Sequence, residues 1–304
     1  NRPGNGVTAG PRPRDRLYPS DALNDLNAVP LPELIEIVPL DHPVQAEVTV
    51  PGSKSITNRA LILAVLAGGE TILEGALWSE DTQVMVGCLR ELGFRVNVEA
   101  DPREAGNRTI TVCGKGGEGP PGGTGARPVD LFVGNAGTAA RFVAALVCLG
   151  QGYYRLHGVP RMHERPQAAL FNALRALGSR VDTPNDKLPA LVCGRGAQAG
   201  KCRVSIEESS QFASALLLCA NAGGWEVEVT GENADESPYV AMTRKLIESF
   251  PRGGGRYLIE PDASSASYFL AAGHLLSAGE TLQVVKDPNR PFPAKADAPP
   301  SAVT

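Results

Sequence analysis

Short polar clusters that could bind anions recur at the starts of apolar helical segments in this sequence. Each cluster combines hydroxyl, amide or charged side chains, and the four clusters begin at Gly52, Asn135, Glu208 and Asp262. A helix start offers unpaired N–H groups and partial positive charge, which suit phosphate and carboxylate groups. Several such starts placed side by side would form a pocket for a polyanion.

The first cluster brings Lys54, Ser55 and Arg59 to one helix start, although the helix dipole disfavours basic residues at that end. It is not a Walker A loop, because the glycine that such a loop has five residues upstream is absent. A simple helix cap by Ser53 or Ser55 and an anion-binding site both fit the pattern.

The second cluster repeats this arrangement after a strand-like segment that ends at Val133. Asn135 opens the turn, Gly137 allows close approach to the backbone, and Arg141 lies one helical turn after Thr138. Glycine-rich turns from strand to helix are common. The cluster is informative because it occurs at the same point of a repeat as the first.

Two further segments carry groups suited to an oxyanion. Segment 158–166 contains Arg161, whose guanidinium could hold carboxylate or phosphate bidentately or could belong to an ordinary charged loop. The third cluster offers Ser209, Ser210 and Gln211, which fit phosphate binding and helix capping equally.

The last two helix starts favour structural roles. Tyr239 follows Ser237 and Pro238, where a simple cap with a half-buried tyrosine is favoured, and Asp262 has the position of an N-cap. Together the clusters supply cations and hydroxyls but neither a Ser-His-Asp set nor a metal-ligand cluster. Such a site suits a reaction run by positioning and neutralising small polyanions.

The elements that position these clusters form repeated units of strand, helix, strand, helix and a closing strand pair. Alternating apolar residues followed by a helical apolar period predict an α/β fold built of βαβαββ units. Strands are expected near residues 46–50, 71–75, 96–98, 109–112, 129–133, 153–158, 181, 191–192, 204–206 and 227–231, and second helices ending near 93, 178 and 250.

The third copy is shorter than the first two. Cluster positions 53, 135, 208 and 262 give intervals of 82, 73 and 54 residues, and the fourth unit begins soon after Phe250. We therefore expect a deletion that removes the closing strand pair of the third copy. A tail unrelated to the repeat is expected after Val285.

Composition narrows the classes of partner. The net charge of −4 argues against nucleic acid or an anionic membrane surface. The apolar stretches Ala60–Ala67 and Phe142–Leu149 are far shorter than the roughly 20 residues that span a bilayer. Six cysteines without C-x-x-C spacing and the absence of a secretory signal predict free, mostly buried thiols and a cytoplasmic location.

Five segments resemble motifs of the 5-enolpyruvylshikimate-3-phosphate synthase family, in that family's order. They are residues 51–60, 134–141, 160–166, 209–212 and 262–269, and the likeness runs from about Leu34 to Val285. The resemblance implies the inside-out α/β barrel fold of enolpyruvyl transferases, with two domains of three repeat units each. It also implies transfer of the enolpyruvyl group of phosphoenolpyruvate to the 5-hydroxyl of shikimate 3-phosphate, releasing phosphate, without metal or organic cofactor.

Ten residues stand at positions that the resemblance assigns to substrate binding: Lys54, Ser55, Arg59, Asn135, Gly137, Arg161, Ser209, Ser210, Gln211 and Tyr239. Lys54 would contact both substrates, and Ser55 and Arg59 would hold shikimate 3-phosphate. Ser209 and Ser210 would bind its phosphate group.

The remaining assignments concern the second substrate and the space between the two. Asn135 and Gly137 would approach phosphoenolpyruvate through their loop, and Arg161 would bind it directly. Gln211 would lie between both ligands, and Tyr239 would line the shikimate side.

Two departures from the family pattern limit these expectations. Where the family has Ser two residues before a Pro-Tyr pair, this chain has Glu236, so Ser237 substitutes or the contact is lost. The resemblance places the proton-accepting Asp, with further Lys and Arg residues, in later repeats beyond residue 304. We therefore expect no catalytic carboxylate in this chain and weak or no turnover by it alone.

The expected domain organisation follows from the repeat and the resemblance. A first α/β domain is predicted over residues 51–258, and an incomplete second domain from residues 33–50 and 259–285. Residues 1–32, rich in proline, and 286–304 are predicted to be disordered. We expect a monomer.

Two alternatives to the synthase stay open. A catalytically silent chain would at most bind shikimate 3-phosphate. The sister transferase that acts on UDP-N-acetylglucosamine normally has Asn after the site lysine and a cysteine in a mobile loop. Ser55 and the motif around Arg161 speak against that alternative.

Overall fold

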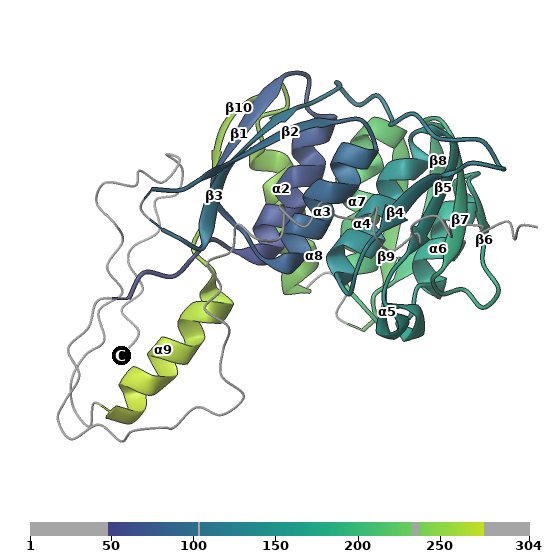
Figure 1. Ribbon diagram of the computed structural model, residues 1–304. Coiled ribbons are helices and arrows are strands. Elements are labelled where there is room, and N and C mark those ends of the chain that lie inside the picture. The colour runs from purple at the N-terminus through teal and green to yellow at the C-terminus, as the bar shows by residue number, and fades with distance from the viewer. Residues whose placement is uncertain (1–47, 103, 233–236, 277–304) are drawn as a thin grey trace, which may run out of the picture. The chain divides into compact units, whose positions relative to one another are not determined.

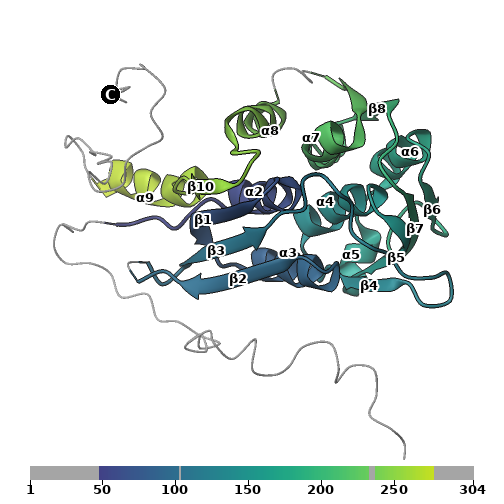
Figure 2. The ribbon, with the colours of Figure 1, turned by 90° about the horizontal axis from the view of Figure 1, so that it is seen from above.

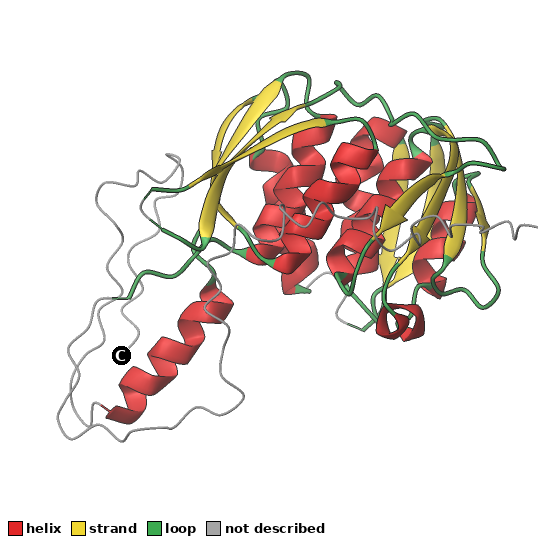
Figure 3. Ribbon diagram, viewed as in Figure 1, coloured by secondary structure: helices red, strands yellow, loops and turns green. Residues whose placement is uncertain are grey.

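The computed structural model describes residues 48–102, 104–232 and 237–276, which all belong to the unit Glu47–Thr304. Its strands form three open sheets rather than one closed barrel. The main helices pack against one another between the sheets, so that helices form the interior and strands the outside (Figure 1, Figure 3).

The first repeat unit begins with a helix that Ser53 caps and ends with an antiparallel strand pair. Its elements are α2 (Lys54–Leu66), β1 (Glu70–Leu77), α3 (Glu80–Glu91), β2 (Arg95–Ala100) and β3 (Asn107–Cys113). The Ser53 hydroxyl accepts a hydrogen bond from the N–H of Ile56 at 3.5 Å, so α2 starts by local capping. Strand β3 pairs antiparallel with both β1 and β2, which closes this unit.

The second unit is complete. Its elements are β4 (Val129–Phe132), α4 (Gly137–Cys148), β5 (Gln151–His157), α5 (Pro160–Glu164), α6 (Ala168–Ala176), β6 (Arg180–Asp182) and β7 (Ala190–Arg195). Strands β4 and β5 are parallel, and β7 and β6 extend the sheet in the order β4-β5-β7-β6. Every residue of α4 is buried, because helices and strands pack on all of its faces.

Among the described residues, the third unit has no closing strand pair, as the spacing of the clusters predicted. Its elements are β8 (Gly200–Ser205), α7 (Gln211–Gly223), β9 (Trp225–Thr230) and α8 (Pro238–Ser249). Within the described residues, β9 pairs only with β8. The sheet of this unit therefore has two strands where each of the other two sheets has four.

The fourth unit contributes a strand to the first one. It consists of β10 (Gly255–Leu258) and α9 (Ala263–Leu276), and β10 lies parallel to β1 (Figure 1, Figure 2). This strand was not predicted. A strand was expected at 46–50, and this prediction is wrong for residues 48–50, which lie in no strand. The outer edge of β1 pairs with β10 instead. Asp262 caps α9 as expected, accepting a hydrogen bond from the N–H of Ser264 at 2.9 Å.

The four predicted helix starts are confirmed, since α2, α4, α7 and α9 all begin at their polar clusters. Helix α7 ends as expected, with Gly224 at a φ of 66° that suits glycine as a C-cap. Other expected features fall on residues outside those described: the segments 1–32 and 286–304, Glu236 and most of the second-domain residues.

The core is continuous across the first three units and includes Ile259, one residue beyond the predicted first domain. The division into domains at residue 258 stays a prediction. All six cysteines are free, as predicted, and Cys88, Cys148, Cys202 and Cys219 are buried. Among the described helices, none has the length and apolar character needed to cross a bilayer.

Candidate functional site

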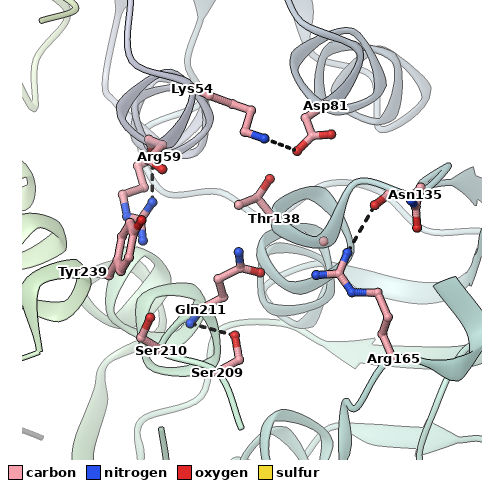
Figure 4. Close-up of a pocket in the computed structure, with 12 residues that line it drawn as sticks. Lys54, Arg59, Asp81, Asn135, Thr138, Arg165, Ser209, Ser210, Gln211 and Tyr239 are labelled. Atoms are coloured by element: carbon pink, nitrogen blue, oxygen red, sulfur yellow. Dashed lines mark hydrogen bonds and ion pairs between the residues drawn. The ribbon is translucent and has the colours of Figure 1, made fainter. Parts of the chain in front are cut away.

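The first turns of five helices converge on one pocket of about 490 Å³. Figure 4 shows this pocket between α2, α3, α4, α7 and α8. Its lining residues are Lys54, Ser55, Arg59, Asp81, Asn135, Gly137, Thr138, Arg165, Ser209, Ser210, Gln211 and Tyr239. Because each helix start carries partial positive charge and free N–H groups, the pocket is prepared for an anion.

Nine of the ten predicted site residues line this pocket, and Arg161 does not. Arg161 is exposed on the short helix α5, whose buried side chain is Met162. Arg165, just after that helix, lines the pocket instead, and its Nη1 donates to the carbonyl oxygen of Asn135 at 3.2 Å. The predicted segment therefore reaches the pocket through Arg165, and the assignment of Arg161 to substrate binding stays a prediction.

Arg59 is almost fully buried behind the pocket and has no acidic partner among the described residues. Its Nε donates to Thr243 Oγ1 at 2.8 Å, its Nη2 to Ser214 Oγ at 2.9 Å, and its Nη1 to the Ser55 carbonyl oxygen at 2.9 Å. Burial lowers the pKa of this guanidinium to about 10. All of these partners are neutral oxygens, so the positive charge is uncompensated and an anionic ligand would stabilise it.

Arg141 is a second buried cation of the same kind, and its place one turn after Thr138 gave it no predicted role. Its Nη1 donates to the Gly137 carbonyl oxygen at 3.1 Å and to Gln211 Oε1 at 3.4 Å, and its Nη2 donates to the Pro166 carbonyl oxygen at 3.0 Å. Burial and the nearby charge of Arg165 lower its pKa to about 10. Arg141 therefore supports the pocket floor and adds positive potential.

Two guanidinium groups approach Gly137 closely. A Cβ at this position would collide with Arg141 and lie 2.6 Å from Arg165 Nη2. Both arginines therefore press against the α4 start, where the backbone N–H groups are free.

Thr138 is a lining residue that prediction did not assign. Its Oγ1 accepts a weak hydrogen bond from Asn58 Nδ2 at 3.4 Å, which links the starts of α2 and α4. Because Asn58 donates to this oxygen, the Thr138 hydroxyl proton is free to point elsewhere. Asn58 itself is fully buried, and its Oδ1 has no partner among the described residues.

The residues at the α7 start form a local capping hydrogen bond and also line the pocket. The Ser209 hydroxyl accepts a hydrogen bond from the N–H of Gln211 at 3.3 Å, which is a local capping interaction. Ser209, Ser210 and Gln211 also line the pocket (Figure 4). Tyr239, which is 44% exposed, closes the side next to Arg59, and the Cζ atom of the Arg59 guanidinium lies 5.9 Å from the centre of its ring.

The fold and the site define an α/β protein in which five helix starts line one pocket and two buried arginines stand beside it. Residues 40–253 match the family EPSP synthase (3-phosphoshikimate 1-carboxyvinyltransferase), and the chain belongs to this family. It is 42% identical over 262 residues to the 3-phosphoshikimate 1-carboxyvinyltransferase of Trichormus variabilis, and 40% over 265 residues to that of Opitutus terrae. These alignments cover 79% and 80% of the chain.

The chain spans about 59% of the length of these curated relatives. Among solved structures, EPSP synthase from Acinetobacter baumannii matches with a TM-score of 0.62 and 20% identity over 78% of this chain and 54% of that one. The described α/β arrangement therefore has the fold of EPSP synthase, as the motifs predicted.

Proposed function

We propose that this chain carries the shikimate 3-phosphate half of an enolpyruvyl-transfer site. The reaction is transfer of the enolpyruvyl group from phosphoenolpyruvate to the 5-hydroxyl of shikimate 3-phosphate, with release of phosphate. One observation carries the proposal: two buried arginines without acidic partners in the described chain stand behind a pocket formed by five helix starts. That arrangement needs a ligand with several negative charges.

Within this proposal, the α7 start takes the phosphate of shikimate 3-phosphate. Ser209 and Ser210 offer hydroxyls there, and the first N–H groups of α7 offer further donors. Arg59 and Ser55 hold the same substrate from the α2 side, and Lys54 reaches both substrates. Tyr239 lies on the shikimate side, since it packs on Arg59.

Phosphoenolpyruvate is proposed to bind at the α4 start, where Asn135 and Gly137 approach the pocket. Gln211 lies between the two ligands because it spans from α7 toward Arg141. Arg161 stays a prediction for this substrate, and the geometry favours Arg165. The exchanges Arg161→Met and Arg165→Met separate the two, since only the arginine that binds would change affinity for phosphoenolpyruvate.

The catalytic carboxylate remains unassigned in this proposal. A chain that binds shikimate 3-phosphate but turns over weakly or not at all is the expected behaviour of these 304 residues. The same proposal includes a cytoplasmic monomer and the domain division at residues 51–258. Phosphate release from both substrates by the chain alone, lost on Arg165→Met, would show that the site is complete.

Calorimetry with shikimate 3-phosphate tests the binding proposal directly. Native chain should bind the ligand, and Arg59→Met should weaken binding by about 10- to 100-fold, because a hydrogen bond to a charged group contributes about 1.5–3 kcal/mol. Arg155→Met is a matched control, since Arg155 is exposed on β5 and pairs with Asp130 away from the pocket. Absence of any heat at millimolar ligand with a folded native chain would refute the proposal.

A further inference from the structure

One carboxylate lines this otherwise cationic and neutral pocket. Among the described lining residues only Asp81 is acidic, and its Oδ2 lies 3.4 Å from Lys54 Nζ. Figure 4 shows this ion pair spanning the space between α3 and α2. An anion that enters the pocket therefore meets a negative charge as well as the cations.

The start of α3 does not need this carboxylate. Ser79 caps the helix by accepting a hydrogen bond from the N–H of Thr82 at 3.4 Å, and Glu80 already places an acidic side chain in the first turn. Glu80 is exposed and does not line the pocket. Two neighbouring acids thus share the same helix end, and only Asp81 faces the site.

The ion pair with Lys54 does not explain Asp81 either. The two side chains are 47% and 27% exposed, and partly solvated pairs of this kind contribute little to stability. In contrast, a unit negative charge about 6 Å from a bound anion lowers its affinity by roughly 3- to 100-fold, depending on local screening. The carboxylate therefore lowers the affinity for any ligand that presents only negative charge beside it.

A hydroxyl group on the ligand can offset this loss of affinity. An ionised carboxylate only accepts hydrogen bonds, and Asp81 Oδ1 receives none from the described residues. A hydroxyl placed beside Lys54 would donate to this oxygen, whereas inorganic phosphate at the same place would meet repulsion. Charge-assisted hydrogen bonds of this type are among the strong ones.

We propose that Asp81 determines specificity: it disfavours inorganic phosphate and accepts a hydrogen bond from a hydroxyl of a polyhydroxylated phosphate ester. In the empty site it holds Lys54, and in the loaded site it binds a ligand hydroxyl. This inference rests on the proposed function, in which shikimate 3-phosphate supplies both the phosphate and the hydroxyls.

The test compares Asp81→Asn with Glu80→Gln, which removes a charge from the same helix turn without changing the pocket. Calorimetry measures the affinity of each folded variant for shikimate 3-phosphate and for inorganic phosphate. Asp81→Asn should bind inorganic phosphate about tenfold tighter and shikimate 3-phosphate no tighter, so its preference falls at least tenfold. Glu80→Gln should keep the native preference.

Other outcomes would contradict either the specificity role of Asp81 or the proposed function. An unchanged preference in Asp81→Asn would make the residue structural. Equal weakening of both ligands would mean that Asp81 only positions Lys54, and the double variant with Lys54→Met would then show no effect of Asp81. Failure of the native chain to bind shikimate 3-phosphate would overturn the proposed function, and this inference with it.

Discussion

The second and third units of this molecule begin alike and end differently. Both start with a parallel strand pair joined by an apolar helix, β4-α4-β5 and β8-α7-β9. The second then adds β6 and β7 to its sheet, and α6 packs against β6. In the third, β8 is the only described strand that pairs with β9, and a groove of about 480 Å³ lined by Leu217, Trp225 and Ile247 lies beside α8.

The incomplete unit nevertheless supplies much of the site. Ser214 on α7 and Thr243 on α8 hold Arg59, and the α7 start lines the pocket. The closing strand pair is therefore not required to place these groups, because helix–helix contacts between α2, α7 and α8 do so. Stability and site geometry draw on different parts of the unit, and this distinction can be tested.

The largest expected difference is in how readily each unit opens. Cys148 on α4 and Cys219 on α7 are both buried, and burial raises the pKa of both thiols, that of Cys148 to about 12. Neither reacts in place, so labelling reports local opening. We expect Cys219 to be modified at least about 100-fold faster than Cys148, because fewer strands cover the third unit.

Mass spectrometry of peptides after timed labelling of the native chain measures both rates. The same labelling in strong denaturant is the control, where the two thiols should react alike. Equal rates in the native chain would mean that the two units open together, and the contrast between them would be lost.

A smaller difference is expected in the stability lost when the same leucine-to-alanine cavity is made in each unit. Leu146 on α4 and Leu216 on α7 are both fully buried. Leu146→Ala should cost about 4 kcal/mol of unfolding free energy and Leu216→Ala about 2–3, because a less enclosed unit can collapse around the cavity. Urea unfolding measures both, and a larger cost at Leu216 would contradict the comparison.

The local parts of this fold were predictable from the sequence. Ser53 and Asp262 cap their helices through contacts within a few residues, so their chemistry is visible in the sequence itself. The missing strand pair was visible too, because an internal repeat supplies its own standard of comparison. Both predictions depended on short-range pattern.

The features that the sequence did not indicate depend on long-range packing. Strand β10 pairs with β1, although the two lie far apart in the sequence, and no pattern near Gly255 indicates that partner. Arg161 and Arg165 stand in the same motif, and only the turn of α5 decides which one faces the pocket. Asp81 resembles an ordinary first-turn acid, so its position in the site had no signal in the sequence.

The smallest expected effect links the incomplete unit to the site. Ser214→Ala and Thr243→Val each remove a neutral oxygen that holds Arg59, so one guanidinium N–H loses its partner. Affinity for shikimate 3-phosphate should fall about 3- to 10-fold, since a net hydrogen bond contributes about 0.5–1.5 kcal/mol. Calorimetry on the folded variants measures this loss.

Thr230→Val is the matched control, because Thr230 donates to the Val204 carbonyl oxygen at 3.4 Å within the same unit but does not line the pocket. It should lower stability without changing affinity. If all three variants weakened binding alike, the third unit would act on the site through its overall stability. If only the first two did, the helices α7 and α8 would position Arg59 directly, and the missing strands would matter for stability alone.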